Sequence, residues 1–161
     1  MKALTTNGVV LHVDDRGPVD RPTLVFSNSL GSDLRVWQPL LPYLAQELRI
    51  IRYDKRGHGL SASSGSPFSI DDLANDLAGL LDQLGVRDAV IVGLSVGGMI
   101  AQALAARRRD LVRGLVLCDT AHKIGPPEVW ETRIQAISQG GIAAISEAIL
   151  ERWFSADFRA A

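Results

Sequence analysis

Short apolar runs alternate with segments of helical periodicity along most of the chain. The apolar runs lie at 23–26, 48–53, 89–92 and 115–118, and each ends in a polar or glycine-rich turn. Between them, apolar side chains recur at helical spacing over 37–48, where Pro39 and Pro42 disturb the first turns, over 70–84 and over 99–107. Strands that are apolar throughout and alternate with helices predict an α/β fold, with a mostly parallel sheet covered by helices on both faces.

The helix over 70–84 has the clearest boundaries. Ser69 and Asp72 have the spacing of a capping box, in which side-chain and backbone groups satisfy each other at the N-terminus of a helix. Leucine side chains then share one face, and Gly85 ends the helix.

The pattern changes after Gly125-Pro126-Pro127. Apolar positions at helical spacing predict two helices there, with no strand between them. We therefore divide the chain into residues 1–124, which hold the sheet, and residues 125–161, which begin a separate helical segment.

Composition narrows the class of protein. The 161 residues are 47% hydrophobic and 22% charged, which is an ordinary globular composition. The net charge of -1 provides no general attraction to nucleic acid or to an anionic membrane, so neither partner is expected. The single cysteine, Cys118, allows neither an internal disulfide nor a cysteine zinc site. No apolar run is long enough to span a bilayer and no secretory leader is evident, so we expect a cytoplasmic location.

The segment Gly93-Leu94-Ser95-Val96-Gly97 matches G-x-S-x-G and lies between a predicted strand and a predicted helix, as a nucleophile elbow requires. The small neighbours let the strand and helix approach closely, and the sharp turn projects the serine hydroxyl above the sheet. We expect Ser95 to be a nucleophile and the Val96 N–H, at the start of a helix, to stabilise an oxyanion. A purely structural turn is the alternative. A phosphate-binding loop fits poorly, because neither G-x-x-x-x-G-K-[ST] nor G-x-G-x-x-G is present.

A second oxyanion donor is expected from the loop that follows the strand at 23–26, because that strand lies beside the nucleophile strand in the expected sheet. The Leu30 N–H is the best candidate, since Ser29 and Gly31 allow a close backbone approach. An ordinary surface loop is the alternative interpretation.

Four stretches also carry a resemblance: FSNSLGSDLRVW at 26–37, YDKRGHG at 53–59, GLSVGGM at 93–99 and LCDTA at 117–121. On these residues the chain resembles the α/β-hydrolases and, within them, the 3-oxoadipate enol-lactonases of aromatic catabolism. The stretches at 53–59 and 93–99 are general to the superfamily, whereas Asn28-Ser29-Leu30-Gly31 and the stretch around Cys118 point to the lactonases. The resemblance implies a serine hydrolase that opens the enol-lactone to 3-oxoadipate, with no metal and no organic cofactor.

The resemblance further implies that residues 125–161 begin a helical cap over the site. Trp130 and Arg133 would lie on the first cap helix, where an arginine suits the carboxylate of the substrate. Simple packing of Trp130 and solvation of Arg133 are the alternatives.

A serine nucleophile needs a base, and these hydrolases place the acid and then the histidine after the serine. The resemblance puts both, with the last strands, beyond Ala161. Asp119 and His122 are local substitutes, but they are only three residues apart on one connection, which suits a triad poorly. His12, in an early strand, and His58, in a turn, have structural explanations.

We therefore expect part of a longer hydrolase, whose sheet edge at 115–118 pairs with a C-terminal fragment or a second copy. The leading function is hydrolysis of an ester or lactone through an acyl-enzyme on Ser95. Alternatives within the fold are an esterase, a cofactor-free haloperoxidase and a carbon–carbon bond hydrolase, while a dehalogenase is disfavoured because it needs an aspartate nucleophile. A catalytically silent binding module that lacks the base is an alternative of a different class.

Overall fold

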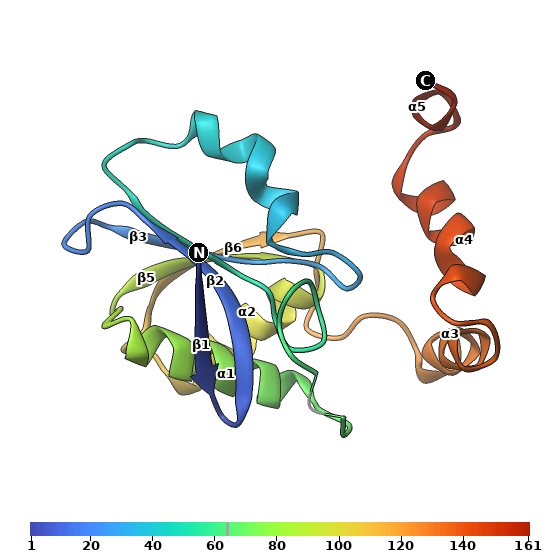
Figure 1. The fold of residues 1–161 in the computed structure, drawn as a ribbon, viewed down its shortest axis with the longest axis horizontal. Coiled ribbons are helices and arrows are strands. Elements are labelled where there is room, and N and C mark those ends of the chain that lie inside the picture. Colours follow the sequence, from blue (N-terminus) through green and yellow to red (C-terminus); the bar gives the residue numbers. More distant parts are fainter. Residues whose placement is uncertain (64) are drawn as a thin grey trace. The chain divides into compact units, whose positions relative to one another are not determined.

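The computed structural model describes residues 1–63 and 65–161 and places six of their strands in one sheet (Figure 1). The strands are β1 (Lys2–Thr6), β2 (Val9–Arg16), β3 (Thr23–Ser27), β4 (Arg49–Tyr53), β5 (Ala89–Leu94) and β6 (Val112–Cys118). Their order is β1-β2-β4-β3-β5-β6, with β3 to β6 parallel and the β1–β2 hairpin antiparallel. The predicted α/β fold with a mostly parallel sheet is confirmed. The antiparallel hairpin is an addition that the alternation of strands and helices did not predict.

The helical segments are the 3-10 helix η1 (Leu34–Tyr43) and the α-helices α1 (Ile70–Gln83), α2 (Val96–Arg107), α3 (Pro127–Gly140), α4 (Ala143–Trp153) and α5 (Ala156–Ala160). The predicted capping box of α1 is confirmed: the Ser69 hydroxyl accepts the Asp72 N–H, and the Asp72 carboxylate accepts the Ser69 N–H at 2.8 Å. Gly85 follows the end of α1 with a φ of 64°, which a glycine adopts without strain.

Two helix predictions were wrong in type or extent, and one short helix was not predicted. The helix expected over 37–48 is the 3-10 helix η1, which begins at Leu34 and ends at Tyr43. Pro39 and Pro42 lie inside it and lack the N–H groups that an α-helix would need there. The helix expected from Met99 begins at Val96, directly after Ser95. A third helix, α5, follows the two expected after Pro127.

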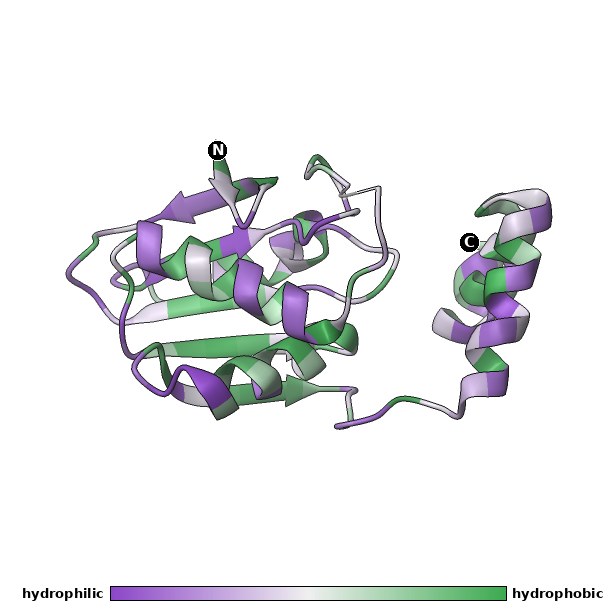
Figure 2. Ribbon diagram, turned by 90° about the horizontal axis from the view of Figure 1, so that it is seen from below, coloured by the Kyte–Doolittle hydropathy of each residue, from purple (hydrophilic) through white to green (hydrophobic). Residues whose placement is uncertain are grey.

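Successive side chains of the central strands are buried on opposite faces of the sheet. Val25, Ile51 and Ile91 pack in the cluster that contains the buried faces of α1 and α2. Phe26 packs with Trp37 of η1 in a second cluster, their ring centroids 5.0 Å apart. Helical segments therefore cover both faces (Figure 1), and Figure 2 shows the hydrophobic central strands between them.

The chain divides into two compact units, Met1–His122 and Lys123–Ala161. The first unit contains the sheet with η1, α1 and α2, and the second contains α3, α4 and α5. The observed boundary lies close to the expected one between residues 124 and 125. Within the second unit, as the structure describes it, α3, α4 and α5 contain no buried residue.

The β6 strand lies at the end of the sheet and pairs only with β5 among the described strands. Val116 and Leu117 of β6 are each 46% exposed. This part of the chain therefore has the apolar sheet edge that was expected at 115–118. None of the described helices is long and apolar enough to cross a membrane.

Candidate active site

Ser95 lies on the turn from β5 to α2 with φ 54° and ψ -117°, a conformation that a residue with a Cβ rarely adopts. Backbone hydrogen bonds hold it there: the Ser95 N–H donates to the Cys118 carbonyl at 3.0 Å, and its carbonyl accepts the Gly98 N–H at 2.9 Å. The turn therefore has the sharp strand-to-helix geometry that the motif predicts. The serine is half-buried at the carboxyl end of the parallel strands.

The glycines of the motif let β5, α2 and β3 approach closely. A Cβ on Gly93 would overlap the backbone of Gly97, and a Cβ on Gly97 would overlap the Ser27 carbonyl at the end of β3. The N-terminus of α2 is therefore packed against the start of the loop that contains Leu30. This contact brings the two segments with the expected oxyanion donors to the same place.

Val96 is the first residue of α2 and is buried. The N–H groups of the first helical turn have no partner within the helix, so they can stabilise negative charge. Leu30 follows β3 in a turn, and its side chain is 39% exposed. Gly31 beside it has a φ of 74°, which supports the tight turn.

Thr120 supports the turn at Ser95 from the β6 side, a contact that the sequence did not indicate. Its hydroxyl donates to the Ser95 carbonyl at 2.6 Å, and its side chain fills the space that a Cβ on Gly98 would occupy. The only signal in the sequence was its place in the LCDTA stretch at 117–121.

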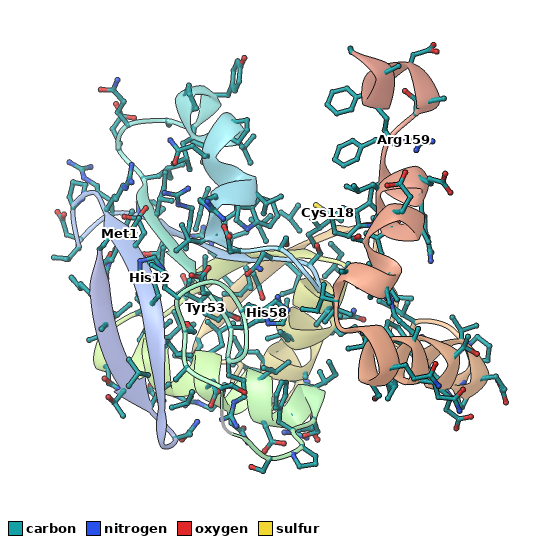
Figure 3. The ribbon with its side chains drawn as sticks, turned by 45° about the vertical axis from the view of Figure 1, so that its right-hand side comes forward. Met1, His12, Tyr53, His58, Cys118 and Arg159 are labelled. Atoms are coloured by element: carbon teal, nitrogen blue, oxygen red, sulfur yellow. The ribbon has the colours of Figure 1, made fainter. Side chains whose placement is uncertain are left out.

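Lys55 and His58 support the Leu30 loop from the turn after β4, and the sequence assigned Lys55 no role. Lys55 Nζ donates to the carbonyl oxygens of Asn28, at 3.1 Å, and Ser29, at 2.7 Å. His58, labelled in Figure 3, accepts the Gly31 N–H on Nε2 at 3.3 Å. Burial lowers the pKa of Lys55 to about 7 and also lowers the pKa of His58, with the Lys55 charge adding to the second effect.

Trp130 and Arg133 both lie on α3 and contact each other. Trp130 Nε1 donates to the Ile124 carbonyl at 2.6 Å, and the Arg133 guanidinium carbon lies 5.6 Å from the centroid of the Trp130 ring. Each side chain therefore has a local partner in the second unit. Their contact with a substrate stays a prediction.

Residues 22–140 match the family model described as the alpha/beta hydrolase fold. The chain belongs to this family. It is 37% identical over 155 residues to 3-oxoadipate enol-lactonase 2 of Acinetobacter baylyi, a match that covers 96% of this chain and 58% of the relative. A putative carbamate hydrolase of Stutzerimonas stutzeri, RutD, is 33% identical over 88% of this chain and 55% of its own length. The crystal structure of the enol-lactonase from Burkholderia xenovorans LB400 superposes with a TM-score of 0.93 at 41% identity, over 99% of this chain and 62% of that one.

This α/β-hydrolase chain thus spans about three fifths of the length of the relatives it matches. Membership of this family agrees with the mostly parallel sheet described above.

The carboxylates and histidines of this α/β-hydrolase do not assemble a base at Ser95 in the part that the structure describes. Asp119 and His122 are both exposed after β6, and within residues 1–63 and 65–161 no hydrogen bond or ion pair joins them to each other or to Ser95. His12 binds Asp54 instead, Nδ1 to Oδ2 at 2.8 Å. The described residues, 1–63 and 65–161, contain no cluster of three or more His, Cys, Asp or Glu side chains suited to a metal ion.

Proposed function

We propose that this chain provides the nucleophile and the oxyanion donors of a serine hydrolase that acts on a carboxylic ester or lactone. The strained turn of Ser95 at the N-terminus of α2 is the observation that supports it. The Ser95 hydroxyl oxygen bonds to the substrate carbonyl carbon, and a base takes its proton. The bond from the carbonyl carbon to the leaving oxygen then breaks, and this oxygen takes the proton from the base. Water then gives a proton to the same base, attacks the acyl-serine and releases the acid, and the base returns the proton to the Ser95 oxygen. The N–H groups of Val96 and Leu30 stabilise the oxyanion that forms in each step.

The proposed substrate is the enol-lactone of 3-oxoadipate. Two relatives support this choice, 3-oxoadipate enol-lactonases 1 and 2 of Acinetobacter baylyi, at 34% and 37% identity. Arg133, stacked beside Trp130, is the proposed partner of the substrate carboxylate. Exchange of Arg133 for glutamine should then raise KM with little change in kcat, because a uniform binding contact is lost.

We further propose that the acid and histidine come from sequence that corresponds to the remaining length of the relatives. The unpaired side of β6 supports this, since another strand beside it would cover Val116 and Leu117. The 161-residue chain alone should self-associate through the same edge. Sedimentation velocity tests this expectation, and a monomer at all concentrations would contradict it.

Intact-mass spectrometry after treatment with a fluorophosphonate tests the nucleophile directly. In the longer protein that carries the proposed acid and histidine, one adduct is expected on Ser95, located by peptide mapping and absent from Ser95→Ala. Ser138→Ala is the matched control, because the hydroxyl of this exposed serine of α3 bonds, among the described residues, only to the Ile134 carbonyl of its own helix. A chain that never reacts lacks a working base and corresponds to the silent alternative.

Once labelling has shown that Ser95 is reactive, turnover of three substrates by untreated protein separates the candidate hydrolase activities. Faster turnover of the enol-lactone than of p-nitrophenyl acetate supports the lactonase. The reverse order supports a general esterase. Release of ammonia from a carbamate supports the chemistry named for the relative in Stutzerimonas stutzeri.

A further inference from the structure

The two peptide groups beside Leu30 are each held by a side chain of the turn after β4. Lys55 Nζ donates to the Ser29 carbonyl oxygen at 2.7 Å, and His58 Nε2 accepts the Gly31 N–H at 3.3 Å. The Ser29 carbonyl belongs to the same peptide group as the Leu30 N–H. The Gly31 N–H belongs to the next group, together with the Leu30 carbonyl. A group outside the loop therefore contacts each plane that flanks Leu30, and Ser32 within the loop also donates to the Ser29 carbonyl from its hydroxyl at 3.1 Å.

The contact between Lys55 and the Ser29 carbonyl also determines the direction of the Leu30 N–H, because both groups belong to one planar peptide. A trans peptide points its C=O and N–H in opposite directions, and the described residues contain no cis peptide bond. Because the Ser29 carbonyl faces Lys55, the Leu30 N–H faces away from it. The start of the same loop lies against the nucleophile turn, where Gly97 meets the carbonyls of Ser27 and Asn28.

Lys55 is an unusual choice for a purely structural contact. Its side chain is 1% exposed, and among the described ion pairs none includes it. Three buried arginines of the same region instead pair with aspartates: Arg49 with Asp15, Arg52 with Asp14 and Arg56 with Asp76. The Asp54 charge favours the ammonium, but no described carboxylate forms an ion pair with it and its burial is costly. The orientation of the carbonyls that it binds is therefore the more specific reason for its presence.

His58 can hold the Gly31 N–H only when its imidazole is neutral. Its Nδ1 donates to the Arg56 carbonyl at 3.1 Å, which leaves the Nε2 lone pair to accept the Gly31 N–H. A protonated imidazole has no lone pair and cannot accept this hydrogen bond. The charged groups that face His58 are Lys55 and Asp54 of its own turn.

We propose that Lys55 and His58 are positioning residues that orient the Leu30 N–H as an oxyanion donor for Ser95. Neither touches the reacting atoms, and both act through the backbone of the loop from Asn28 to Gly31. The proposal rests on the function proposed above for Ser95 and Leu30.

The test compares Lys55→Met with Lys55→Arg, which keeps a donor, and with Lys123→Met, an exposed lysine of the second unit. Two readouts are taken: the first-order rate at which a saturating fluorophosphonate labels Ser95 in the longer protein that carries the proposed acid and histidine, and the ¹H–¹⁵N signals of Leu30 and Gly31 in the 161-residue chain. Lys55→Met should label about 10- to 100-fold more slowly, since loss of a whole oxyanion donor costs more. The half-saturating concentration should stay within about twofold, and Lys55→Arg should recover part of the rate.

The two readouts separate the failure of this proposal from failure of the proposed function. An unlabelled wild-type protein that carries the proposed acid and histidine overturns the proposed function, while the amide signals still report whether Lys55 and His58 hold the loop. Labelling at the wild-type rate in Lys55→Met, with Leu30 and Gly31 signals unchanged, overturns the positioning role.

An acid titration of the unaltered chain serves if Lys55→Met does not fold. The Gly31 amide signal should then shift with the same midpoint as the His58 ring signals, as Nε2 gains its proton. Independent midpoints overturn the role of His58.

Discussion

Thr120, just past the end of β6, donates its hydroxyl hydrogen to the carbonyl oxygen of Ser95 at 2.6 Å. The bond connects the strained turn at Ser95 to the end of the strand at the sheet edge.

Thr120→Val keeps the shape of the side chain and removes the donor, so we expect the free energy of unfolding to fall by about 1 kcal/mol. Urea denaturation measures the change. Thr5→Val, at an exposed position of β1, is the control and should stay within about 0.5 kcal/mol of the wild type. Equal losses in the two variants would contradict a special role for Thr120.

Gly97 is packed against backbone rather than against flexible side chains. A Cβ there would overlap the Ser27 carbonyl at the end of β3, and neither β3 nor α2 can move without disturbing the sheet. Gly97→Ala should therefore lower the free energy of unfolding by about 3 kcal/mol or more. Gly114→Ala in β6 is the matched control, because its Cβ would meet only the Val90 side chain at 4.0 Å. Urea denaturation of the two variants should separate them clearly, and similar midpoints would refute the close approach.

Local patterns predicted the parallel strands β3 to β6 and the helix α1, but not the β1–β2 hairpin. Strand burial shows as continuous apolar runs, and the capping box of α1 is contained in four consecutive residues, 69–72. The extent of η1 was missed because two prolines remove α-helical donors while the apolar spacing stays helical. The start of α2 was missed because Val96, Gly97 and Gly98 have poor intrinsic preference for a helix, and packing against β3 and β6 overrides it.

The candidate site was predictable where a motif fixes the backbone, and not where distant segments meet. Ser95 was identified from its strand–turn–helix context. Thr120 and Lys55 carry no such signal, since their partners are backbone carbonyls of segments remote in the sequence. A sequence pattern does not show which carbonyl a side chain will meet, so both residues required the fold.

The buried Lys55 gives stability a defined pH dependence. Burial lowers its pKa to about 7 from the ordinary 10.5, so between these values the unfolded chain binds more protons than the folded chain. The stability of the folded chain that depends on uncharged Lys55 is fully present above pH 10.5, and it is lost as the pH falls towards 7. The stability difference between the wild type and Lys55→Met should therefore rise by up to about 1.4 kcal/mol per pH unit in this window.

Urea denaturation at about pH 7.5, 8.5 and 9.5 measures this slope. Lys123→Met, at an exposed lysine, should follow the wild type at each pH. A constant difference between the wild type and Lys55→Met would show that Lys55 keeps its ordinary pKa.

Ser95 has a backbone conformation that suits glycine better than any residue with a Cβ, since its φ is 54°. Ser95→Gly and Ser95→Ala both remove the hydroxyl and should abolish fluorophosphonate labelling. Relief of the strain should make the glycine variant about 1 kcal/mol more stable than the alanine variant, after the entropy cost of glycine is included. Asn75, exposed inside α1, supplies the matched pair, and there glycine should be about 1 kcal/mol less stable than alanine. Urea denaturation of the four variants therefore tests whether the stability difference between glycine and alanine has opposite signs at Ser95 and at Asn75. The same order at both positions would mean that the turn stores no strain, and the geometric case for a nucleophile at Ser95 would lose its support.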